Sequence, residues 1–326
     1  MIRARLAFAL IASLALAAVA PAQSPVQWKG NARAAIEDAQ AQSLPLMFWV
    51  SERQDWDDDD LRDAQERAFR DPIVVWLSRS RFIPVRVTRS SNVIKAAEEF
   101  GLPTTHGLYI AVLSPSGKVL AEISPDDVSN PETLATRLMS SFNAYRSDVY
   151  ESKVKPVLDN PESTVPQLRE AMSTVWRLGI RAADEHVVKL LERPNLTPTQ
   201  RAKLYSMLAS LATKPCIDRL LAAAPTDKDA QRALRGAETG ALKFLLSEIP
   251  APDPAQGSVK DPGPGLNDRQ FAAYTAACAV ARAGEPRPRA FWEKSPARRQ
   301  AEELADCRRK AEAVLSYWEE GEGKYR

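Results

Sequence analysis

Histidine and cysteine are scarce in this chain, and their placement excludes several kinds of site. The 326 residues include two histidines and three cysteines, and all three cysteines lie in the second half. No two cysteines have the Cys-x-x-Cys spacing used by dithiol redox sites and many zinc sites. No glycine-rich phosphate loop, Ser-His-Asp ordering or histidine-rich metal spacing is present either. The sequence therefore contains no familiar catalytic or metal-binding arrangement built on cysteine or histidine.

A large excess of charge and long apolar runs are also absent beyond the N-terminus. The 44 basic and 42 acidic residues give a formal net charge of +2, which argues against nucleic acid as a partner. The apolar run Leu6–Val19 follows Arg3 and Arg5 and precedes small residues, as in a secretory signal. It is shorter than the roughly 20 residues that cross a bilayer. We expect a signal peptide at residues 1–22 and a mature chain exported to the periplasm or extracellular space, with no transmembrane segment.

The three cysteines, Cys216, Cys278 and Cys307, allow one disulfide and leave one thiol over. Export would permit such a bond. Cys278 and Cys307 are the candidate pair, because both fall in adjacent predicted helices. The alternative is that all three are small apolar core residues. Redox catalysis by these cysteines is not expected.

The first part of the mature chain alternates predicted helices and strands. Predicted helices cover residues 31–42, 57–69, 71–80, 92–101 and 131–145, and predicted strands cover 45–50, 81–87 and a hairpin at 108–123. The hairpin turn, Ser114–Gly117, contains proline and glycine where such turns favour them. Strands separated by helices and completed by a hairpin predict one mixed sheet flanked by helices.

From residue 147 onward the strand pattern disappears, and apolar residues recur at a spacing of three or four. Predicted helices lie at 165–180, 183–191, 199–212, 216–223, 229–248, 268–283 and 296–317. A stretch rich in proline and glycine at 249–267 predicts a loop. Antiparallel helix pairs are the natural packing, and a short solenoid is one such arrangement. We therefore expect an α/β domain at 23–146 and an all-helical domain at 147–326.

A cluster of aspartates follows the first predicted strand. The sequence SERQDWDDDDLRD, residues 51–63, places Trp56 directly before four consecutive aspartates, Asp57–Asp60, where a helix is expected to begin. A carboxylate near a helix N-terminus is stabilised by the helix dipole by about 0.3–1 kcal/mol. It can also accept hydrogen bonds from the free N–H groups of the first turn. The aspartates are therefore suited to starting a helix.

This junction and the order of elements resemble the thioredoxin superfamily over residues 28–146. Exported members of that family carry Trp-Cys-x-x-Cys between a strand and a helix. In the same frame this chain keeps Trp56 and has Asp57 and Asp60 at the two cysteine positions. The family's cis-proline would stand near Leu108, where this chain has no proline. A carboxylate cannot replace the thiolate that attacks a disulfide, so the resemblance implies a thioredoxin-like fold without redox chemistry.

The resemblance also implies a binding surface at the former active-site groove. The residues that would line it are Trp56, His106 and Leu108. We expect a non-catalytic protein that binds an unknown polypeptide, or serves as a scaffold, in the cell envelope. No cofactor is expected.

Two other functions remain open from the sequence. The acidic stretch matches the oxygen-ligand positions of a 12-residue calcium loop. The matching side chains are Asp55, Asp57, Asp59, Asp63 and Glu66, with the carbonyl of Leu61 as a further ligand. Such loops have glycine at position 6, where this chain has Asp60, so a solvated acidic helix start is the simpler interpretation. The second alternative is an enzyme. It could be a thiol-disulfide oxidoreductase with cysteines acting in trans, or it could have an active site in the helical domain that shows no recognisable motif.

Overall fold

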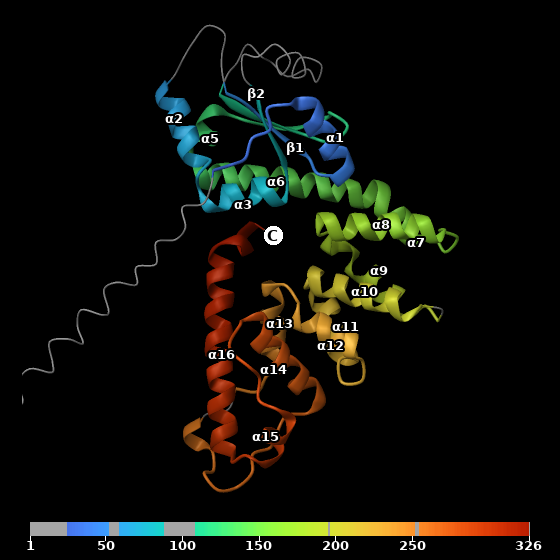
Figure 1. The fold of residues 1–326 in the computed structure, drawn as a ribbon, viewed down its shortest axis with the longest axis vertical. Helices are drawn as coiled ribbons and strands as arrows, with labels where there is room; N and C mark the ends of the chain where they lie inside the picture. The colour runs from blue at the N-terminus through green and yellow to red at the C-terminus, as the bar shows by residue number, and fades with distance from the viewer. Residues whose placement is uncertain (1–24, 52–58, 88–107, 195, 252–253, 326) are drawn as a thin grey trace, which may run out of the picture. The chain divides into compact units, whose positions relative to one another are not determined.

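A computed structural model describes residues 25–51, 59–87, 108–194, 196–251 and 254–325 (Figure 1). The chain divides into two compact units at Leu138/Met139. This division falls inside helix α6 (Pro131–Val149), whereas the sequence places the domain boundary after residue 146. The predicted signal peptide and the predicted helix at 92–101 lie outside the described residues.

The first unit contains a four-stranded mixed sheet in the order β2-β1-β3-β4. The strands are β1 (Leu46–Val50), β2 (Ile83–Val87), β3 (Tyr109–Leu113) and β4 (Val119–Ile123). Strand β1 is parallel to β2 and antiparallel to β3, and β3 and β4 form the predicted hairpin. Lys29 makes a single parallel bridge to Val85 of β2. Because β1 and β3 are the central strands, every residue of both is buried. The predicted mixed sheet is confirmed.

In the described part of the first unit, five helices accompany this sheet, and local sequence signals set several of their ends. They are α1 (Ala32–Gln42), α2 (Asp59–Ala68), α3 (Pro72–Ser80), α5 (Pro125–Ser129) and the start of α6. The Asp71 carboxylate accepts hydrogen bonds from the first-turn N–H groups of α3, and Pro72 follows it, as helix starts favour. Helix α5 was not predicted, because five residues are too few to show a helical period.

An aromatic cluster fills the core beside β1. Trp49 is fully buried, and its ring lies 5.3 Å from that of Trp28 and 4.6 Å from that of Phe69, centroid to centroid. Trp28 and Phe69 meet edge to face at 4.9 Å. Aromatic pairs in such geometry contribute about 0.5–1.5 kcal/mol beyond their buried area. The cluster therefore anchors the segment before α1 and the end of α2 to the central strand.

The described part of the second unit is helical, without a strand of its own. Its longer elements are α7 (Lys155–Asp159), α8 (Val165–Leu178), α9 (Asp184–Leu190), α10 (Pro198–Leu211), α11 (Lys214–Ala223), α12 (Lys228–Arg235), α13 (Leu242–Glu248), α14 (Asp268–Val280), α15 (Arg289–Lys294) and α16 (Ala297–Glu320). A π-helical turn (Tyr150–Val154) joins α6 to α7. Helix α10 packs against α9, α11 and α12, and α16 packs against α13 and α14. The predicted helix-rich second part is confirmed.

One predicted helix is wrong. The expected single helix over 229–248 is divided into α12 and α13, with Gly236 ending α12 and a 3₁₀ turn (Thr239–Ala241) leading into α13. Each glycine costs a helix about 0.8–1 kcal/mol relative to alanine. Gly240 also lies against the Trp318 ring, where a Cβ would come within 2.9 Å of Cη2. The break therefore has both a local and a tertiary cause.

The loop predicted at 249–267 is mostly irregular in the structure. The stretch 249–267 contains one short 3₁₀ turn (Pro254–Gln256) and is otherwise without helix or strand where it is described. Helices α7 and α15 were not predicted, since each is shorter than two turns. Across the residues that the structure describes, no helix has both the length and the apolar character needed to cross a membrane.

Candidate functional site

The candidate site lies where β1 ends and α2 begins, beside the residue that precedes β3. Four of the predicted site residues lie outside the described residues, namely Asp55, Trp56, Asp57 and His106. The described ones are Asp59, Asp60, Asp63, Glu66 and Leu108. Asp59 and Asp60 occupy the first turn of α2 and are exposed, as a solvated acidic helix start requires.

Gln65 of α2 ties the elements of this site together. Its side chain is fully buried and accepts a hydrogen bond from Trp49 Nε1 at 2.8 Å. Its amide nitrogen donates to the carbonyl oxygens of Leu108 at 2.5 Å and Pro125 at 3.1 Å. A buried amide is stable only when its polar atoms are paired in this way. One side chain therefore joins α2 to β1, to the start of β3 and to α5.

The backbone of Leu108 forms a hydrogen bond with the last residue of β1. Its N–H donates to the Val50 carbonyl at 2.6 Å, and its φ of 64° lies in the left-handed region. That region is uncommon for any residue with a Cβ and notable for a bulky one. Proline has no N–H and holds φ near −65°, so it could not replace Leu108 in this conformation. At the position where the resemblance would place a cis-proline, the chain instead has a leucine whose N–H donates to the Val50 carbonyl. No cis peptide bond occurs among the described residues.

Arg86 of β2 lies over the same end of the sheet. Its guanidinium stands 4.6 Å from the centre of the Trp49 ring, and its Nε donates to the buried Ser51 Oγ at 3.1 Å. Its Nη2 lies 3.5 Å from the Glu66 carboxylate. A cation over an indole ring gains about 0.5–2 kcal/mol, depending on desolvation. The only sequence signal for this residue was a charge inside the otherwise apolar strand IPVRV.

The described calcium-ligand candidates lie along a helix. Asp59, Asp63 and Glu66 occupy successive turns of α2, so at 1.5 Å per residue their backbones span roughly 10 Å of helix axis. Asp59 is paired with Arg62, and Glu66 is paired with Arg86. Within the described ranges, no three His, Cys, Asp or Glu side chains are placed to hold a metal ion together. These three carboxylates alone do not form a coordination sphere.

The chemistry available at this site follows from its side chains. It has amide, guanidinium and carboxylate groups that are already used in holding the fold, together with three exposed aspartates on α2, Asp59, Asp60 and Asp63. No cysteine occurs before Cys216 in the chain. Thiol-disulfide exchange therefore has no nucleophile in the first unit.

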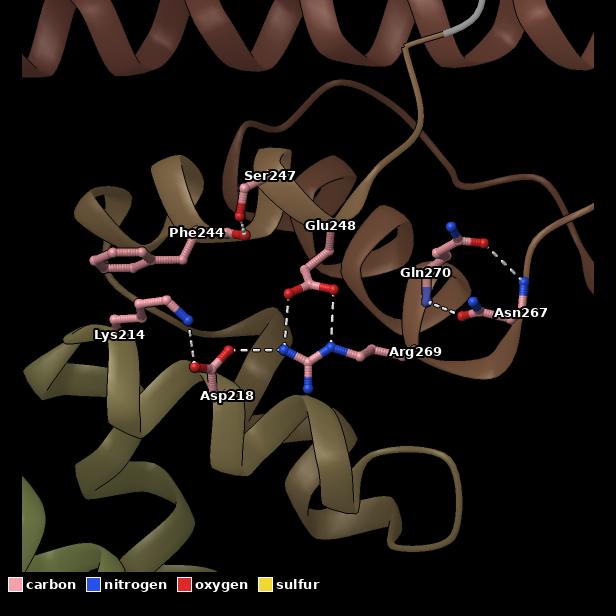
Figure 2. A network of polar contacts seen from close by, with 8 residues as sticks. All are labelled: Lys214, Asp218, Phe244, Ser247, Glu248, Asn267, Arg269 and Gln270. Atoms are coloured by element: carbon pink, nitrogen blue, oxygen red, sulfur yellow. Dashed lines mark hydrogen bonds and ion pairs between the residues drawn. The ribbon is translucent and has the colours of Figure 1, made fainter.

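A second polar cluster lies within the helical unit (Figure 2). Arg269 of α14 donates through Nε and Nη2 to both Glu248 oxygens, each at 2.8 Å, and through Nη2 to Asp218 Oδ1 at 2.7 Å. Lys214 Nζ donates to the other Asp218 oxygen at 2.6 Å. Two cations and two carboxylates balance each other, so the cluster acts as a brace between α11, α13 and α14 and leaves no net charge for a ligand.

The predicted cysteine pair is adjacent in the structure. Cys278 of α14 and Cys307 of α16 are buried thiols whose sulfur atoms lie 3.4 Å apart. Cys216, on α11, is also a buried free thiol. The two cysteines predicted to pair are therefore neighbours, and the disulfide between them stays a prediction.

Comparison with known proteins adds no relative to this description. The chain matches no family model, no curated protein and no solved structure.

Proposed function

We propose that the first unit is a thioredoxin-like domain without thiol chemistry, and that the protein binds a polypeptide partner through the acidic start of α2. Three features support this proposal. The sheet pairs a parallel β1–β2 with an antiparallel β3–β4 hairpin, helix α2 follows β1, and the first 215 residues contain no cysteine. All three agree with a thioredoxin-like frame from which the reactive groups have been lost.

The observation that carries the proposal is the fixing of α2 by Gln65. Because that side chain is fully buried and bonded to three separate elements, α2 is held rigidly against the sheet. Its outer face presents Asp59, Asp60 and Asp63 to solvent. A rigid surface loses little conformational entropy on binding, and three carboxylates on one helix complement a basic segment.

Trp56 precedes this helix by three positions in the sequence. Tryptophan is enriched among residues that dominate binding energy at protein interfaces. An aromatic residue beside exposed carboxylates suits a partner segment that combines basic and apolar side chains. The expected signal peptide would place this interaction in the cell envelope or outside the cell.

The test is capture of partners from the envelope fraction on immobilised mature protein. Wild type is compared with Asp59→Asn/Asp60→Asn/Asp63→Asn and with Trp56→Ala. The matched control, Glu170→Gln/Glu319→Gln/Glu320→Gln, removes the same charge from exposed positions on α8 and α16. We expect the aspartate variant to lose at least tenfold in recovery of a partner that the control retains, and we expect this difference from wild type to shrink as salt rises, because salt screens the attraction that the three aspartates provide. Equal recovery by all four proteins would remove this surface from consideration.

An insulin-reduction assay with a thiol donor separates this proposal from an oxidoreductase. If the protein only binds, insulin is reduced at the same rate with the protein present as with the thiol donor alone. Turnover by the purified mature chain would favour the enzyme alternative, and the thiols involved would then have to be those of the helical unit, Cys216, Cys278 and Cys307.

A further inference from the structure

Cys278 and Cys307 face each other inside the helical unit. Helices α14 and α16 pack together, and the two side chains are 4% and 3% exposed with their sulfur atoms 3.4 Å apart. The sulfur atoms of a disulfide are about 2.05 Å apart, so an approach of about 1.4 Å completes the bond. Rotation of side chains on two neighbouring helices can supply such a movement.

We propose that Cys278 and Cys307 are a modification site, at which an intramolecular disulfide links α14 to α16 while Cys216 remains a thiol. An unfolded chain with three cysteines can form any of three pairs. Packing of α14 on α16 selects one of these pairs, since Cys216 lies on α11. The proposal does not depend on the function proposed for the first unit.

The surroundings of the two thiols make them unequal. The hydrogen bond with Cys307 lowers the pKa of Cys278 against the opposing effect of burial. The hydrogen bond with Cys278 and burial both raise the pKa of Cys307. Cys278 is therefore the thiol that ionises first.

The reaction needs an external disulfide, such as oxidised glutathione or the disulfide of a protein oxidase. The Cys278 thiolate attacks one sulfur of that disulfide, forms a mixed disulfide and releases one external thiol. Cys307 then loses its proton to solvent or a leaving thiolate and attacks Cys278 Sγ, releasing the second external thiol. Two electrons pass to the external disulfide, and the protons of both protein thiols end on the two released thiols.

The third cysteine is a poor competitor. Burial raises the pKa of Cys216 to about 11, so its thiolate is rare near neutral pH. The Cys278–Cys307 bond would close a loop of 29 positions that contains α15. A cross-link of this kind restricts the unfolded chain and raises the melting temperature.

The experiment refolds the full reduced chain in a buffer of reduced and oxidised glutathione and then blocks the remaining thiols with N-ethylmaleimide under denaturing conditions. Peptide mass spectrometry assigns the pairing. We expect one disulfide, Cys278–Cys307, with Cys216 alkylated, and a melting temperature several degrees above that of the reduced protein. The same oxidation carried out in concentrated guanidinium should yield a mixture of all three pairs.

Variants keep the result interpretable. Cys216→Ser should retain both the disulfide and the rise in melting temperature, whereas Cys278→Ala and Cys307→Ala should each lose the rise. The wild-type peptide map needs no variant, so it stands even if a buried alanine impairs folding. Three free thiols after refolding, or any pair that includes Cys216, would overturn the proposal.

Discussion

The indole N–H of Trp49 donates a 2.8 Å hydrogen bond to the side-chain oxygen of Gln65, and both side chains are fully buried. The bond joins the central strand β1 to helix α2. Because the other end of the same amide holds the Leu108 and Pro125 carbonyls, loss of this one side chain would leave three polar groups without their partner.

The first prediction concerns this residue. Gln65→Met keeps nearly the same volume but removes every hydrogen bond, so we expect it to lower the free energy of unfolding by about 2–4 kcal/mol, given about 1–3 kcal/mol for a buried unsatisfied group. Urea unfolding measures the loss. Gln40→Met on the exposed face of α1 is the control and should change stability by less than about 0.5 kcal/mol. Equal effects of the two substitutions would contradict the role given to Gln65.

The second prediction concerns the backbone at Leu108. Leu108→Pro removes the N–H that donates to Val50 and is incompatible with a φ of 64°, so we expect it to cost at least about 3 kcal/mol. Leu108→Ala retains the N–H and loses only side-chain burial, and it serves as the matched control. Denaturant unfolding of both proteins separates the two effects. A proline variant as stable as the alanine variant would show that the hydrogen bond from the Leu108 N–H to Val50 does not contribute to stability.

The third prediction concerns the break between α12 and α13. A Cβ on Gly240 would lie 2.9 Å from Trp318 Cη2, so Gly240→Ala must displace that ring and should cost about 1–3 kcal/mol. Gly236→Ala is the control, because its Cβ would meet its nearest neighbours at 3.6 Å or beyond. Thermal unfolding, followed by circular dichroism, should show a lower melting temperature for the first variant alone.

The fourth prediction concerns pH and the brace around Arg269. Hydrogen bonding to Arg269 lowers the pKa of Glu248 from its ordinary 4.5. Burial raises the pKa of Asp218, but hydrogen bonds from Lys214 and Arg269 outweigh it and leave that pKa below 3.8. A carboxyl group with a lowered pKa in the folded state stabilises the fold above its unfolded pKa, and this stabilisation is lost as pH falls through the folded value.

Arg269→Met should therefore destabilise the protein at pH 7 by about 1–2 kcal/mol, less than a buried pair would lose because these groups are partly exposed. The difference from wild type should shrink as pH falls below about 4.5, where the carboxyl groups of both proteins become protonated. Urea unfolding at a series of pH values measures this difference in the free energy of unfolding. A difference that stays constant down to pH 3 would show that the carboxylates do not contribute.

The fifth prediction concerns calcium. Since Asp59, Asp63 and Glu66 are spread along α2, we expect millimolar calcium to shift the melting temperature by no more than the same concentration of magnesium does. Isothermal titration calorimetry should likewise detect no saturable heat. A calcium-specific rise that a chelator reverses, and that Asp59→Asn abolishes, would restore the calcium-loop hypothesis.

Several features of the site could not have been predicted from the sequence. The acidic helix start was readable, because helix caps and dipole effects act within one turn. For Gln65, the sequence predicted only that the residue lies in a helix. Its hydrogen bond to Leu108 could not be predicted, because the two residues are 43 positions apart. Arg86 was visible as a charge in an apolar strand, but its contact with Trp49 exists only after β1 and β2 pair.

By itself, the sequence determined the alternation of strands and helices in the first unit, the helical character of the second and the absence of a thiol before Cys216. These properties follow from periodicity, caps and residue identity, which act over short stretches of chain. Tertiary structure decided the locking of α2 by Gln65, the break at Gly240 and the meeting of Cys278 with Cys307. Each of these needs two segments distant in the chain to be packed together, and local preferences carry no information about such contacts.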